Sequence, residues 1–255
     1  MTTDIERLRQ NCKQLGLHTM AAMFEPAAQK AAKTKQSYVG FLSHLIDEEL
    51  ASKSDRSVNA RIARARFPVI KTLEQFDFAF QPSIPTPLVR ELAELGFLER
   101  AEALVLCGPP GVGKSHLAIA IGIRACAAHK RVMFRAVPDI LDELIAATVD
   151  HTLAARLNAI SRLHLLVLDE LGYLPMDARR ANLFFQLISR LYERGSIILT
   201  TNKSFEEWGS VFGGDEVIAG AVLDRLLHHS HVLAINGPSY RTKDKRPTKH
   251  GGCRC

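Results

Sequence analysis

The segment 108–115, GPPGVGKS, carries the residue types that hold a phosphate group. Gly108, Gly113, Lys114 and Ser115 match the phosphate-loop pattern G-x-x-x-x-G-K-[ST] without a mismatch. Glycines let successive backbone N–H groups turn inward at a helix N-terminus, where the helix dipole favours an anion. The lysine can reach the β- and γ-phosphates, and the serine hydroxyl can complete a Mg²⁺ shell. The pattern therefore predicts ATP and Mg²⁺ as cofactors, with the nucleotide held by Gly108, Pro109, Pro110, Gly111, Val112, Gly113, Lys114, Ser115 and His116.

A pair of carboxylates ends the apolar run 163–170, LHLLVLDE. The run is typical of a buried strand, and ligands of open α/β sheets lie beyond the carboxyl ends of the strands. We expect Asp169 to hold the metal ion and Glu170 to orient or deprotonate the attacking water. Taken alone, the pair is also typical of an ordinary strand end. Downstream of a complete phosphate loop, it predicts an enzyme, an Mg²⁺-dependent ATPase.

A third polar strand end comes from SIILTTN, residues 196–202. Asn202 at this position can hydrogen-bond the γ-phosphate or the attacking water, so we include it among the catalytic residues with Lys114 and Glu170. The alternative is an asparagine that only starts the next turn. Ser204 and Glu207 then form an S-x-x-E capping box, which predicts a helix start.

The elements around these residues alternate between strand and helix. Alternation of this kind predicts an α/β fold with a mostly parallel, doubly wound sheet and right-handed crossovers. Gly195 is expected to be the C′ residue that ends the helix over 177–193. The predicted strands cover 102–107, 131–137, 163–170, 196–202 and 231–236, and the predicted helices cover 115–130, 138–150, 151–162, 177–193 and 215–229.

Length and composition fit an intracellular globular protein. The chain has 255 residues, 47% of them hydrophobic, so it can bury a large core. Neither a signal peptide nor an apolar run of 18 or more residues is present, so we expect a cytoplasmic protein without a membrane partner. The odd number of cysteines predicts free thiols, and we assign Cys253 and Cys255 to tail composition instead of to a metal site.

Charge is distributed unevenly along the chain. Residues 1–66 hold 11 Lys/Arg and 7 Asp/Glu, residues 67–240 hold 16 and 19, and residues 241–255 hold 6 and 1. Basic ends on a mildly acidic core suggest nucleic acid as an extended partner. We therefore expect an N-terminal helical, basic DNA-binding domain over 1–66, a connector over 67–98, an ATPase domain over 99–240 and a basic tail over 241–255.

The most basic part of the N-terminal region is predicted to be one helix ended by Pro68. At 100° per residue, four cationic side chains fall within about 140° of one face. Such a face suits phosphate contacts along duplex DNA, although a solvated surface helix is the alternative. The connector that follows contains three prolines and is expected to be irregular, and its aromatic cluster can pack on the sheet or cover an adenine. The predicted DNA-binding residues are Lys53, Arg56, Arg61 and Arg64, and the aromatic cluster is Phe76, Phe78 and Phe80.

Several longer segments resemble one known family. GPPGVGKSHLA, LLVLDELGYLP, FEEWGSVF and DRLLHH together are similar to the IstB-like helper ATPases of insertion-sequence transposition. These belong to the AAA+ class, beside the DnaC helicase loaders and the DnaA-type initiators. The resemblance covers nearly the whole chain, from LRQNCKQLGLHTMAAMFE to INGPSYR. Val112 and Ser115 stand where threonine is frequent in the family, and the tail after Arg241 does not match a family motif.

The resemblance implies an AAA+ P-loop ATPase core, preceded by a small helical domain, in an ATP-driven DNA-binding protein that assists a partner transposase. It further implies a homo-oligomer with ATP at the subunit interfaces, where Arg225 matches the arginine supplied by a neighbouring subunit. The short segment after Arg241 predicts that a C-terminal lid domain is absent. A replicative helicase loader of the DnaC type and a nucleotide-switched DNA-binding module with negligible turnover remain the alternatives.

Overall fold

The computed structural model describes residues 2–245, and its contacts divide the chain into a unit ending at Ala60 and a unit beginning at Arg61. The predicted tail over 241–255, with its two cysteines, falls mainly outside the described residues. None of the described helices combines the length and the apolar run needed to cross a membrane.

The first unit is helical, as predicted. Cys12, Ala21, Phe24 and Leu45 are buried in it. Its net charge is small, because residues 1–60 hold 8 Lys/Arg and 7 Asp/Glu. The basic excess of the N-terminal region therefore comes from three arginines after Ala60. The helices are α1 (Thr2–Gln14), α2 (His18–Lys33) and α3 (Tyr38–Ala65), whose last turn belongs to the second unit.

The second unit contains a five-stranded sheet in the order β2-β3-β4-β1-β5, and every pairing is parallel. The α/β prediction with a mostly parallel sheet is confirmed. Because both faces are covered, the strands are continuous apolar runs instead of alternating ones. The strands are β1 (Ala103–Cys107), β2 (Val132–Ala136), β3 (Leu165–Leu171), β4 (Ser196–Thr201) and β5 (Ser230–Ala234).

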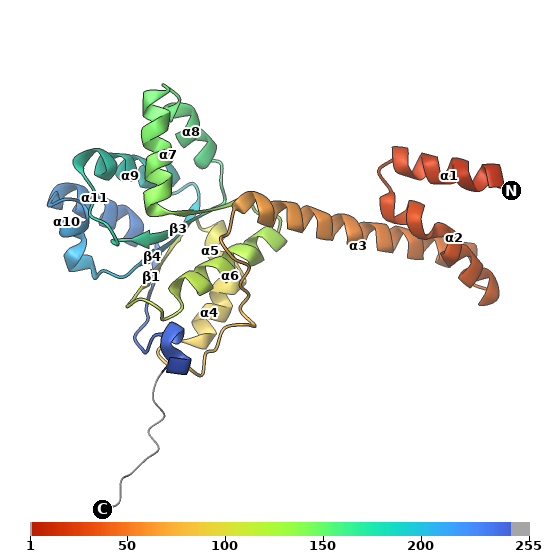
Figure 1. Ribbon diagram of the computed structural model, residues 1–255, viewed down its shortest axis with the longest axis horizontal. Helices are drawn as coiled ribbons and strands as arrows, with labels where there is room; N and C mark the ends of the chain where they lie inside the picture. The colour runs from red at the N-terminus through yellow and green to blue at the C-terminus, as the bar shows by residue number, and fades with distance from the viewer. Residues whose placement is uncertain (1, 246–255) are drawn as a thin grey trace, which may run out of the picture. The chain divides into compact units, whose positions relative to one another are not determined.

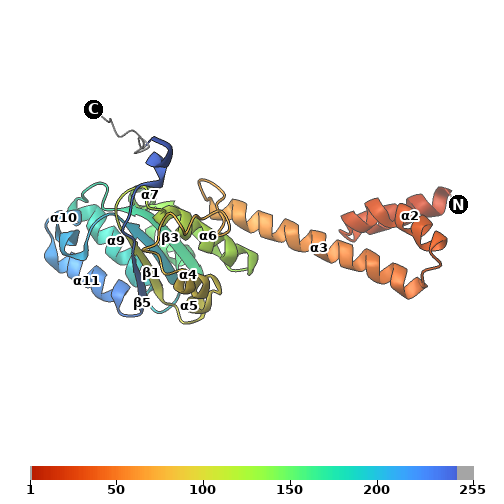
Figure 2. The ribbon, with the colours of Figure 1, turned by 90° about the horizontal axis from the view of Figure 1, so that it is seen from below.

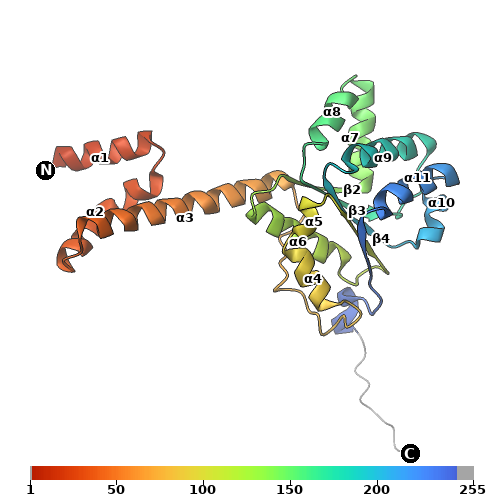
Figure 3. The ribbon, with the colours of Figure 1, turned by 180° about the vertical axis from the view of Figure 1, so that it is seen from behind.

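Helices cover the two faces of this sheet unequally (Figures 1 and 3). One layer consists of α4 (Thr86–Ala93), α5 (Gly96–Glu99) and α6 (Lys114–Ala127). The other layer consists of α7 (Val137–Val149), α8 (Leu153–Ile160), α9 (Ala178–Leu191), α10 (Trp208–Val211) and α11 (Glu216–Leu227). Two short 3-10 helices, η1 (Phe205–Glu207) and η2 (Tyr240–Lys245), complete the described elements.

Alternate side chains of each central strand enter the two cores. In β3, Leu165 and Val167 pack with the α4–α6 layer, whereas Leu166 and Leu168 pack with the α7–α11 layer. This alternation follows from the two-residue period of a strand. The loops that carry the predicted chemistry follow the carboxyl ends of these strands (Figure 2).

Two local predictions are corrected by the structure. The connector is not irregular throughout, because α4 and α5 lie inside it and bury Val89, Leu92 and Phe97. Pro87 is tolerated there because the first helical turn has no partner for its N–H. Gly195 is not the left-handed residue after α9; Glu193 takes that conformation with φ 57°. Gly195 is needed instead for a close approach, since a Cβ there would lie 2.7 Å from the Leu163 carbonyl oxygen.

Candidate functional site

The phosphate loop joins β1 to α6 at the carboxyl edge of the sheet. Gly108 has φ +147°, and a Cβ on it would lie 2.1 Å from the carbonyl oxygen of Ile235. Gly113 has φ +104° and lies directly under the ring of Phe76. Helix α6 begins at Lys114 without a side-chain cap, so its first N–H groups remain available to an anion.

Lys114 is folded back onto this loop. Its Nζ donates hydrogen bonds to the carbonyl oxygens of Gly108, at 2.6 Å, and Pro109, at 2.8 Å. Burial lowers the pKa of the ammonium group, and the nearby Asp169 carboxylate opposes that shift. The lysine is therefore a buried cation whose hydrogen bonds go to two loop carbonyls, and a phosphate oxygen can replace them as acceptor.

Asp169, on β3, links the start of α6 to the end of β4. One of its carboxylate oxygens, Oδ1, accepts a hydrogen bond from Ser115 Oγ at 2.8 Å and a second from the Thr200 hydroxyl of β4. A hydroxyl next to a carboxylate is the hard oxygen donor set that Mg²⁺ prefers. The residues predicted to hold the metal, Ser115 and Asp169, thus lie side by side and fit the ion.

Glu170 lies in a β-bulge at the tip of β3. The register with β4 shifts between Leu168 and Leu171, and Glu170 has φ +68°, which is unusual for a residue other than glycine. The bulge aims the exposed Glu170 side chain away from the ladder. Thr200 fixes this conformation, because its hydroxyl accepts the Glu170 backbone N–H at 3.0 Å.

Thr200 was missed by the sequence reasoning. It is 1% exposed and links the metal-binding carboxylate to the backbone of Glu170. The available signal was the pair of threonines that ends an otherwise aliphatic strand. Asn202, which was predicted, follows the same strand; its side-chain oxygen is buried and has no hydrogen-bond partner among the described residues. It can therefore accept a hydrogen bond from a bound water.

A cavity of about 390 Å³ adjoins the phosphate loop on the side of the connector. Phe76 lies in its wall, packs on Gly113 and meets the His116 ring edge-on at 5.1 Å. His116 Nε2 is 2.8 Å from the Thr72 carbonyl oxygen, and burial lowers the pKa of the ring. His116 thus donates to the connector and holds it over the loop. Tyr240 closes the far side, donating its N–H to the Gly111 carbonyl at 2.9 Å.

A second cavity, of about 610 Å³, opens beside the reactive carboxylates. Arg135 lies in its wall, 8% exposed, and donates to Glu143 Oε1 at 2.8 Å. Arg66 also lines the cavity, and arginines pair with two of its five carboxylates, Asp142 and Glu143. The acidic lining residues are Asp139, Asp142, Glu143, Asp169 and Glu170.

Arg225 is far from these groups within one subunit. It precedes β5 and lines a small cavity with Ala101 and Ala103, at the amino edge of the sheet. Strand β1 separates that edge from the phosphate loop and spans roughly 13 Å. The guanidinium lies 4.7 Å over the Phe185 ring and donates to the Ala221 carbonyl at 2.9 Å. The structure therefore does not bring Arg225 together with the other catalytic residues.

The four predicted DNA-binding residues differ in their surroundings. Lys53, Arg56 and Arg64 are exposed, and Arg61 is half-buried. Arg56 forms an ion pair with the buried Glu49 at 3.0 Å, and Glu49 also accepts the Met20 N–H at 2.8 Å. In the second unit, Arg61 Nε is buried without a hydrogen-bond partner among the described residues. Arg56 is thus engaged in an ion pair and Arg61 is partly packed, and helical periodicity reveals neither.

The fold and site define a class. A parallel sheet with a phosphate loop after β1, a carboxylate pair after β3 and an asparagine after β4 is the core of an AAA+ P-loop protein. Two solved structures share this fold: a DnaC helicase loader, with TM-score 0.50 and 24% identity, and the replication initiator DnaA bound to AMPPCP and single-stranded DNA, with TM-score 0.55 and 23% identity. The similarity covers 59% of this chain and 87% of the first structure, and 66% of this chain and 50% of the second.

Sequence comparison identifies the family. The model of the IstB-like ATP binding proteins matches residues 10–248, so the chain belongs to that family. It is 47% identical to the ATP-binding protein of insertion sequence IS21 from Pseudomonas aeruginosa, over 91% of this chain and 88% of the relative. It is 41% identical to that of insertion sequence IS5376 from Geobacillus stearothermophilus, over 94% and 96%. The resemblance predicted from the motifs is confirmed.

Proposed function

We propose that this protein is an ATP-dependent DNA-binding helper of transposition, which assembles on duplex DNA and assists a partner transposase. One observation is the main support for the catalytic part of the proposal. The hydroxyls of Ser115 and Thr200 both donate hydrogen bonds to the Asp169 carboxylate, and Glu170 turns outward next to them. The names of the relatives, as ATP-binding proteins of insertion sequences, support the biological setting.

In the proposed reaction, the loop N–H groups and Lys114 bind the β- and γ-phosphates. Ser115 and Asp169 hold Mg²⁺, which when bound neutralises developing charge on the phosphate oxygens. Glu170 accepts a proton from the water that attacks the γ-phosphorus, while the bond to the ADP oxygen breaks. Asn202 accepts a hydrogen bond from the same water and so fixes its direction.

Arg225 completes the site from a neighbouring subunit in this proposal. A reach of roughly 13 Å across β1 is too long for an arginine side chain acting within its own subunit. The carboxylate-lined cavity beside Glu170 offers an entry for such a cation. A guanidinium there would stabilise charge on the transferred phosphoryl group. The active form is then a homo-oligomer with ATP at its interfaces.

The adenine is assigned to the cavity between the connector and η2. Phe76 offers an aromatic surface there, and Gln81 and His116 line the same space. The aromatic residues of the connector then have two roles, since Phe76 and Phe78 also pack on the core beneath.

Duplex DNA is bound mainly through its phosphates, because the basic residues lack a base-reading motif. Lys53, Arg56 and Arg64 are the exposed members of the predicted set. Arg56 contributes less because it pairs with Glu49, and Arg61 contributes less because its Nε is buried. ATP strengthens DNA binding by joining several subunits on one duplex, which is multivalency.

Two measurements test the proposal. Phosphate release should require ATP and Mg²⁺ and should stop in Glu170→Gln. This variant should still bind ATP, because the amide cannot accept the proton but the groups that bind the phosphates are unchanged. When Lys53 and Arg64 are both changed to Gln, the slope of log affinity against log salt should flatten by up to about 0.9 for each phosphate that the protein no longer neutralises. An ATPase that survives Glu170→Gln, or an unchanged salt slope, would contradict the respective assignment.

Co-purification distinguishes the partner. The protein with ATP and duplex DNA should retain the transposase encoded by its own insertion sequence. Retention of a replicative hexameric helicase instead would support the helicase-loader alternative. The DnaC-like fold by itself does not distinguish the two functions.

A further inference from the structure

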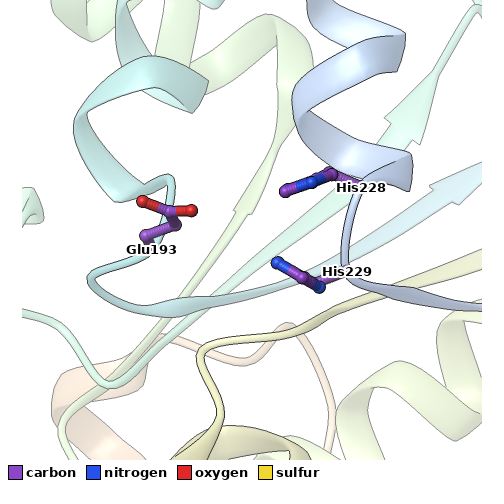
Figure 4. Close-up of side chains that lie close together, drawn as sticks. All are labelled: Glu193, His228 and His229. Carbon is purple, nitrogen blue, oxygen red and sulfur yellow. The ribbon is translucent and has the colours of Figure 1, made fainter.

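A cluster of metal-ligating side chains lies at the amino edge of the sheet, away from the phosphate loop. Glu193 follows α9, His228 ends α11, and His229 leads into β5 (Figure 4). One ring nitrogen of each histidine and one carboxylate oxygen of Glu193 all lie within 4.8 Å of one another. Figure 4 shows the carboxylate on one side of a gap and the two imidazoles on the other.

The donor set has a definite chemical preference. Two imidazole nitrogens and one carboxylate oxygen suit a divalent transition ion such as Zn²⁺, and leave further positions to water. Around a tetrahedral zinc ion such ligands lie about 3.4 Å apart, as follows from bonds of about 2.0–2.2 Å. The three side chains are exposed, so rotation about their side-chain bonds can close the remaining gap.

Tyr192 orients the cluster. Its hydroxyl is 2.8 Å from His228 Nδ1. The same hydroxyl also has a side-chain hydrogen bond with Glu193, whose carboxylate accepts. A phenol that donates to Glu193 accepts from His228 Nδ1–H, and this tautomer leaves Nε2 with the free lone pair. Metal-bound histidines in proteins are held in the same way by a hydrogen bond on the other ring nitrogen.

We propose that Glu193, His228 and His229 form a binding site for a divalent transition ion of the zinc class, with Tyr192 as its positioning residue. The ion joins the ends of α9 and α11, which pack against each other. It also lies at the C-terminus of α11, where the helix dipole favours a cation. Because Arg225 is on the last turn of the same helix, the ion stabilises the part of the chain that carries it.

The test uses the full-length protein without a histidine tag, in a Cys253→Ser/Cys255→Ser background that removes the tail thiols as zinc ligands. Calorimetric titration with Zn²⁺ should give one ion per subunit. His228→Gln, His229→Gln and Glu193→Gln should each weaken binding by at least about tenfold, and Tyr192→Phe by about tenfold. His151→Asn, which changes an exposed histidine outside the cluster, should bind as the background protein does.

Thermal unfolding provides the second readout. Zn²⁺ should raise the unfolding midpoint of the background protein, since an ion that binds only the folded state stabilises it, and should leave the His228→Gln midpoint unchanged. Equal midpoints without zinc show that the variants are folded. Failure to bind a stoichiometric ion, or binding that survives both histidine substitutions, overturns the proposal. Neither result depends on whether the protein hydrolyses ATP.

Discussion

Replacing Thr200 with valine tests how the site holds its reactive carboxylates. Valine has nearly the shape of threonine but lacks the hydroxyl, so the core is not disturbed by a cavity. The change removes the hydrogen bond to Asp169 and leaves the Glu170 N–H without its acceptor. A hydrogen bond to a charged group contributes about 1.5–3 kcal/mol, and a buried unsatisfied donor costs about 1–3 kcal/mol. Allowing for relaxation of the bulge, we expect a loss of about 2–4 kcal/mol in the free energy of unfolding.

The same change should impair catalysis more than binding. Lys114 and the loop N–H groups are untouched, so ATP affinity should stay close to the wild-type value. Displacement of Glu170 by about 1 Å should slow hydrolysis by about 10²-fold. Thr200→Ser is the matched control, since it keeps the hydroxyl and should cost only about 1 kcal/mol. Urea unfolding, nucleotide titration and phosphate release measure the three quantities. A Thr200→Val protein that hydrolyses ATP at the wild-type rate would refute this role.

Three further changes probe other parts of the site. Lys114→Ala should abolish ATP binding in a nucleotide titration, because the loop loses its side-chain cation; binding that persists would remove Lys114 from the site. Arg225→Ala should slow phosphate release by roughly 10³-fold, and mixing it with Glu170→Gln should restore part of the activity. Confirmed mixed oligomers without such rescue would contradict the proposal that Arg225 acts on a neighbouring subunit. Glu49→Gln should lower stability by about 1–3 kcal/mol at pH 7, judged by helical circular dichroism in urea, through loss of its pairing with Arg56. Burial raises the pKa of Glu49, but the backbone hydrogen bonds of Met20 and Thr19, together with Lys53 and Arg56, lower it overall. This contribution to stability is therefore present above the unfolded pKa and is lost as the pH falls through the folded one. A penalty that grows on acidification would contradict that assignment.

The sequence predicted the parts of the site that are local in the chain. A strand, a loop and a helix in succession are enough to position Gly108, Lys114 and Ser115. The phosphate-loop motif and its flanking residues predict all three elements. Asp169 and Glu170 follow from an apolar strand that ends in carboxylates. The parallel sheet follows from alternating elements, and its order brings these tips together.

Contacts through space could not be predicted in the same way. Thr200 reaches Asp169 and Glu170 only because β4 lies next to β3 in the sheet. The local sequence pattern predicts the strands but not their order. Helical periodicity placed Arg56 and Arg61 on a basic face, but it cannot tell that Glu49 pairs with one and that packing buries part of the other. Gly195 was assigned to a helix end because glycine is common there, whereas its role is to let the chain pass close to Leu163.

The dependence of DNA affinity on the bound nucleotide tests the central claim most directly. Fluorescence anisotropy of a labelled duplex, at fixed salt, compares Glu170→Gln with ATP, with ADP and without nucleotide. We predict tight binding with ATP that does not decay with time, since this variant cannot reset the assembly, and weak binding in the other two states. Equal affinity in all three states would contradict an ATP-driven assembly on DNA.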